Sequence, residues 1–121
     1  MRPFAHRAVL ALSPGADRGA PGAAVTVALC GSWEHEPPCP LAPHHTGVDG
    51  PDDALAVRVL FAAAPDDEAE VRRRIDEALE AGETPGPDGG ISRWSVLETA
   101  PDVVRGSERE HAARLAAQPS D

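Results

Sequence analysis

The sequence predicts an α+β fold in which one mixed four-stranded sheet carries two helices on one of its faces. Two observations lead to this prediction. Several short segments alternate apolar and polar residues, as strands do, and one later segment repeats apolar residues at helical spacing. The expected order is strand, strand, strand, helix, strand, helix. The chain has 121 residues, so we treat residues 1–121 as a single domain.

Three strands are expected before the first helix. Residues 4–12 are short and apolar, and residues 23–29 carry valine or leucine at every second position near their end. Residues 54–62 alternate most clearly, with one face that belongs to the core. Residues 13–22 between the first two strands are rich in proline and glycine, which indicates a turn-rich connection.

Residues 66–81 are expected to form the first helix. Acidic side chains crowd its first turn, where the helix dipole favours them, and Val71, Ile75 and Leu79 form an apolar stripe. Gly82 stands where a left-handed C-cap belongs. The arginine run 72–74 is expected to be a solvated face, paired with acidic residues four positions earlier.

The remaining elements complete a two-layer sandwich. Residues 82–90 are expected to be a short loop with neither helix nor strand, and residues 91–99 a fourth strand. The Ser107–Glu110 capping box would open a weaker closing helix at residues 108–118. A helix between the third and fourth strands fits a right-handed crossover, which would place these two strands parallel. A ferredoxin-like arrangement is compatible with these elements, although their order is not the usual one.

The net charge of −9 argues against nucleic acid and anionic membranes as partners, because both require clustered positive charge. No apolar run reaches the length of a membrane span. The apolar patch near the N-terminus stops at Ser13-Pro14-Gly15, too early for a signal peptide. We therefore expect an acidic, cytoplasmic protein; nothing in the sequence sets its oligomeric state.

Both cysteines lie in a long loop rich in Cys, His and Pro, expected over residues 30–53. A loop of this length is usually functional or disordered. Its spacing is Cys-x4-His-x3-Cys-x4-His, followed by one more histidine. The candidate metal ligands are Cys30, His35, Cys39, His44 and His45. Two thiolates with two imidazoles suit tetrahedral zinc, and copper(I) is the second choice.

Other interpretations of this loop stay open. Cys30 and Cys39 could form a disulfide in an oxidising compartment. Trp33 beside the prolines could present a docking surface for a protein partner without any metal. A Cys–His pair could be catalytic, but no recognised catalytic motif supports this, and nearby carboxylates raise a thiol pKa. We favour a non-enzymatic metal-binding protein with a structural or regulatory role, and a metal-free interaction module as the alternative.

Overall fold

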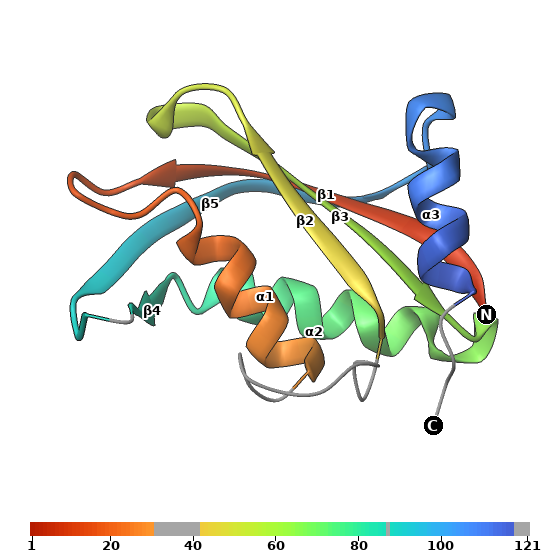
Figure 1. Cartoon of the computed structure of the whole chain (residues 1–121). Coiled ribbons are helices and arrows are strands. Elements are labelled where there is room, and N and C mark those ends of the chain that lie inside the picture. Colours follow the sequence, from red (N-terminus) through yellow and green to blue (C-terminus); the bar gives the residue numbers. More distant parts are fainter. Residues whose placement is uncertain (31–41, 87, 118–121) are drawn as a thin grey trace.

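The computed structural model describes residues 1–30, 42–86 and 88–117. Within them, one five-stranded antiparallel sheet curls into a half-barrel, and three helices pack against it (Figure 1). The strand order across the sheet is β2-β3-β1-β5-β4. The elements along the chain are β1 (Arg2–Leu12), α1 (Ala20–Cys30), β2 (His44–Asp49), β3 (Leu55–Ala63), α2 (Glu68–Glu80), β4 (Glu83–Pro85), β5 (Ile91–Asp102) and α3 (Arg109–Ala116). Single 3-10 turns precede β3, α2 and α3 at Asp52–Ala54, Pro65–Asp67 and Gly106–Glu108.

The α+β class is confirmed, but the predicted mixed four-stranded sheet with two helices on one face is wrong. All four strand pairings are antiparallel. β3 and β5 run in the same direction, but β1 lies between them and pairs with both, so they are not neighbours. The expected arrangement failed because one helix was predicted as a strand and two edge strands were missed.

α1 occupies the segment predicted to be the second strand. Pro21, Val25 and Leu29 lie four residues apart and are all buried, so the same apolar residues also satisfy a helical pattern. Pro21 is the second residue of the helix, where its missing N–H has no intrahelical partner to lose. Apolar alternation over the seven residues 23–29 does not distinguish a strand from a helix. The packing of α1 against α2 favours the helix.

The two edge strands carry weak sequence signals. β2 falls inside the predicted loop 30–53 and reads His-His-Thr-Gly-Val-Asp, with valine as its one large aliphatic residue. β4 has three residues and falls inside the predicted loop 82–90. Each pairs with a long neighbour, β2 with β3 and β4 with β5. Strands that hydrogen bond on one side only are held by their neighbour more than by their own composition.

Apolar side chains from the two faces of the sheet form two separate clusters. The larger cluster lies under α1 and α2, which run side by side along one face (Figure 1). It includes Leu10, Val57, Phe61, Ile75 and Trp94 among its buried members. The smaller cluster contains Ala5, Leu60, Ala62 and Leu115, and it docks α3 at one end of the opposite face. α3 therefore adds a helix on the side of the sheet that was predicted to be bare.

The ends of α2 and α3 follow capping rules. Gly82, directly after the C-cap of α2, has φ +73, the left-handed conformation predicted from the sequence. The indole N–H of Trp94 donates to the Leu79 carbonyl at 2.8 Å and ties this end of α2 to β5. Before α3, the Arg105 amide donates to a Glu108 carboxylate oxygen at 2.8 Å, so the capping interaction lies two residues earlier than predicted. No helix in the described ranges is long and apolar enough to cross a membrane.

Candidate functional site

Of the five candidate metal ligands, the side chains of His44 and His45 lie within the described residues. His35 and Cys39 lie in residues 31–41, outside the described residues, and so does the side chain of Cys30, the last residue of α1. His44 and His45 begin β2. Because neighbouring strand residues point to opposite faces of a sheet, the two imidazoles diverge. His44 contacts α1, whereas His45 contacts α3 on the other face.

Two short contacts orient the His44 ring. Its Nδ1 lies 3.1 Å from the Ala42 carbonyl oxygen, which can only accept, so Nδ1 carries hydrogen and donates. Its Nε2 lies 3.0 Å from the Thr26 hydroxyl on α1. Thr26 is four residues, about one helical turn, before Cys30. The half-buried ring therefore directs Nε2 toward Thr26 on α1, about one turn before the helix ends.

His45 forms a pair with His111 of α3. The ring centroids are 4.7 Å apart and the planes are tilted by 52°. Burial lowers the pKa of His45 below 6.5, and repulsion from the His111 charge lowers it further. No group of three or more His, Cys, Asp or Glu side chains positioned to hold a metal ion is found in the described part of the chain.

A buried network surrounds His6 of β1, which is only 1% exposed. Its Nε2 lies 2.8 Å from an Asp76 carboxylate oxygen and 3.1 Å from the Thr99 hydroxyl. Arg72 donates to its Nδ1 at 3.0 Å. Because a guanidinium only donates, Nδ1 accepts, and the remaining proton is on Nε2, which donates to Asp76. His6 is thus a buried histidine whose two ring nitrogens are both hydrogen-bonded.

Arg72 departs from the solvated role predicted for the arginine run 72–74. Its side chain is only 13% exposed and also donates to the Ala5 carbonyl at 2.6 Å and to Glu68 at 2.8 Å. Its guanidinium carbon lies 5.3 Å from the centre of the Phe61 ring, within cation–π range. The Glu68 pair was predicted, as was the 3.2 Å pair of Arg74 with Glu70.

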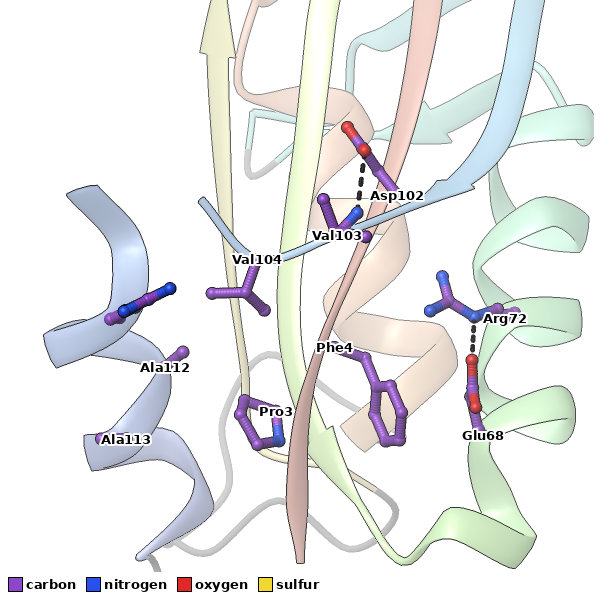
Figure 2. Close-up of a pocket in the computed structure, with 10 residues that line it drawn as sticks. Pro3, Phe4, Glu68, Arg72, Asp102, Val103, Val104, Ala112 and Ala113 are labelled. Atoms are coloured by element: carbon purple, nitrogen blue, oxygen red, sulfur yellow. Dashed lines mark hydrogen bonds and ion pairs between the residues drawn. The ribbon is translucent and has the colours of Figure 1, made fainter. Parts of the chain in front are cut away.

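A pocket of about 540 Å³ opens beside Arg72, and we refer to it as the α2–α3 pocket. It is lined by Pro3, Phe4, Glu68, Arg72, Asp102, Val103, Val104, Arg109, Ala112 and Ala113. Figure 2 shows Arg72 and Glu68 of α2 beside Phe4 of β1 on one side of the pocket. Ala112 and Ala113 of α3 lie on the other side, and Val103 and Val104 lie between the two sides. The pocket lies where β1 continues past the end of β5, since Asp102 pairs with Ala5.

Arg58 of β3 binds two residues that line this pocket, Asp102 and Val103. It donates to both Glu108 carboxylate oxygens, at 2.6 and 2.8 Å, and to Asp102 at 2.7 Å. A further bond, of 2.6 Å, reaches the Val103 carbonyl. Its hydrogen bonds lower the pKa of Glu108 and that of Asp102, and the Glu108 contact above all raises the pKa of Arg58. One side chain thus joins β3, the end of β5 and the start of α3.

The sequence offered one overlooked signal for this arrangement. Arg58 is the one charged residue in the apolar segment 54–62, which indicates a partner for a charge on a core strand. The partners themselves lie more than 40 residues away, so local patterns do not identify them. The pocket also has no linear motif, because its lining comes from four separate parts of the chain.

Comparisons with protein-family models, with curated proteins and with solved structures find no match to this chain.

Proposed function

We propose that this chain is a small metal-binding protein that holds a transition metal ion between the end of α1 and the start of β2. Zinc is the first choice and copper(I) the second. The proposed ligands are Cys30, His35, Cys39 and His44. Two thiolates and two imidazoles would neutralise a divalent ion and satisfy its tetrahedral preference.

The orientation of His44 is the observation that best supports this proposal. Histidines that bind metals commonly donate one ring N–H to a backbone carbonyl, which fixes the tautomer and leaves the other nitrogen to bind. His44 has this arrangement, with Nδ1 donating to Ala42 and Nε2 directed at Thr26 on α1. Metal binding would replace the bond to Thr26. The two cysteines border or lie within the segment that joins these two elements.

His45 is left out of the proposed ligand set. Its ring lies on the opposite face of the sheet and packs on His111. A single ion held beside α1 would therefore use His44 alone of the two neighbours. This difference supplies a matched control, because both are imidazoles on the same strand and one residue apart.

The ion would have a structural or regulatory role. It would fasten residues 31–41, a segment containing three prolines and Trp33, to the sheet and present it to a protein partner. Thiolate ligands require a reducing compartment, which agrees with the cytoplasmic location expected from the sequence.

Metal content of untagged protein purified under reducing conditions tests the proposal. We expect about one zinc or copper ion per chain, by analogy with structural sites of this ligand type. Cys39→Ser should lose the ion and His44→Gln should weaken its binding, while His45→Gln should leave it unchanged. Thiol alkylation should be slow until a chelator is added.

Two results would contradict the proposal. One is a protein that neither contains metal nor takes it up on titration with zinc or copper(I), which would favour the metal-free interaction module. The other is an equal loss of metal from His44→Gln and His45→Gln, because the two rings lie on opposite faces.

A further inference from the structure

We propose that the α2–α3 pocket binds a small organic monocarboxylate with an aromatic or aliphatic body. This site is independent of the proposed metal site, since none of its lining residues belongs to the metal ligand set. Three features support the proposal: the size of the pocket, the partners of its charged residues, and one lining cation that has no partner among the described residues.

The pocket has the size and the surface for an apolar body. Its volume of about 540 Å³ falls within the range of small-molecule sites. Six of its ten lining residues are apolar: Pro3, Phe4, Val103, Val104, Ala112 and Ala113. The rings of Phe4 and Phe61 pack with centroids 5.4 Å apart, which fixes the orientation of Phe4. A flat or branched hydrocarbon group would find apolar contact on both the β1 and the α3 side.

The two carboxylates in the lining already have cationic partners. Glu68 accepts from Arg72 at 2.8 Å. Asp102 accepts from Arg58 at 2.7 Å and from the Val103 amide at 2.8 Å. Neither carboxylate therefore leaves an uncompensated negative charge for a cationic ligand.

Arg109 is the lining cation that has no partner within the part of the chain that the structure describes. Across residues 1–30, 42–86 and 88–117, its guanidinium takes part in no hydrogen bond or ion pair. Arg114, on the same helix, is paired with Glu110 at 3.2 Å and does not line the pocket. A guanidinium presents planar, paired N–H donors that match a carboxylate. Arg109 thus supplies the anchor for an acid whose body occupies the apolar part of the pocket.

The charge around the pocket selects a monoanion over a phosphate. Near the pocket, Glu68 pairs with Arg72, whereas Asp102 and Glu108 share Arg58, and Arg7 Nε lies 4.0 Å from an Asp102 carboxylate oxygen. These three carboxylates and three arginines leave no surplus of positive charge. The whole chain carries a net charge of −9. A dianion would meet more repulsion than one unpaired arginine offsets, whereas a single carboxylate matches one guanidinium.

Chemical shifts of backbone amides on titration of the full chain test this inference. The probes are phenylacetate and its neutral isostere phenylacetamide, and the variants are Arg109→Gln and Arg114→Gln, which change the net charge equally. We expect phenylacetate to bind with a Kd of roughly 1 mM, typical of a ligand of this size. The shifts should concentrate at Phe4, Val103, Val104, Ala112 and Ala113.

The matched pairs decide the outcome. Phenylacetamide and the Arg109→Gln variant should each reduce affinity by about tenfold, while Arg114→Gln should change it by less than about twofold. Equal binding of acid and amide, equal effects of the two variants, or shifts located away from the pocket would each overturn the proposal. The metal content of Arg109→Gln should be unchanged, which separates this test from that of the metal site.

Discussion

Replacing Arg58 with methionine should detach α3 from the sheet while leaving the α1–α2 side of the core in place. The Arg58 side chain is only 15% exposed and that of Glu108 only 17%. Methionine keeps much of the aliphatic length but removes every donor, so a mostly buried carboxylate loses its bidentate partner. Breaking a fully buried pair costs about 3–5 kcal/mol, and the partial exposure here reduces this to about 2.5 kcal/mol. The corresponding fall in Tm is about 10 °C for a chain of this size.

Arg7→Met supplies the control for this prediction. Arg7 lies on β1, on the same face as Arg58, and pairs with Glu98, but the two side chains are 42% and 51% exposed. An exposed pair of this kind contributes at most about 1 kcal/mol. Thermal unfolding at neutral pH should therefore separate the two variants clearly, and hydrogen exchange in Arg58→Met should rise first in the amides of α3. Equal losses of stability would refute the assignment of Arg58 as the residue that holds α3.

The pairing of Arg58 with Glu108 also predicts that the stability of the protein depends on pH. The Arg58 hydrogen bond lowers the pKa of Glu108 below its ordinary value of 4.5. The unfolded chain therefore binds a proton more readily, and the stabilisation is present above pH 4.5 and lost as the pH falls through the lower folded pKa. The stability difference between the native protein and Arg58→Met should narrow in acid. A difference that stays constant into strong acid would contradict this reasoning.

Three further predictions concern the packing of the helices. Gly82→Ala should cost about 1–3 kcal/mol in urea unfolding, because φ is +73 and the new Cβ would lie 3.0 Å from the Trp94 carbonyl oxygen. Because the pKa of His45 is lower in the folded state than its ordinary value of 6.5, the contribution of His45 to the free energy of unfolding is fully present above pH 6.5. This contribution is lost as the pH falls through the folded pKa. His111→Gln should flatten this dependence, and an unchanged slope of stability against pH would exclude the repulsion as a cause. Leu115→Ala should cost about 2–3 kcal/mol and accelerate hydrogen exchange mainly in α3, whereas uniform acceleration would show that α3 does not open separately.

Elements with a long, unambiguous period could be predicted from the sequence. β1 and β3 bury alternate side chains on the helix-covered face, and α2 combines an acidic first turn with an apolar stripe at helical spacing. Gly82 ends α2 as predicted because few other residues adopt a positive φ without strain. In each case the information lies within the segment itself.

Where a segment has only a short apolar pattern or few apolar residues, contacts with neighbouring elements decided its secondary structure. The valine and leucine pattern of α1 is compatible with both strand and helix, and contact with α2 favours the helix. β2 has little apolar content and forms because β3 offers it a hydrogen-bonding edge. The candidate ligands were recognisable as residue types, but the divergence of His44 and His45 follows from β2 being a strand.

The sequence by itself determined the α+β class, the net negative charge, the strongest strands and helix, and the concentration of cysteine and histidine between residues 30 and 45. Only the tertiary structure decided which charged residues are buried. Arg72 belongs to a run of three arginines, yet it alone of the three reaches His6 and the Ala5 carbonyl, on a strand more than 60 residues away. Arg58 meets Glu108 across 50 residues, and Arg109 is left without a partner in the described chain. Helical and strand periods arise from neighbours along the chain, but the pairing of a charge depends on which distant segment the fold places beside it.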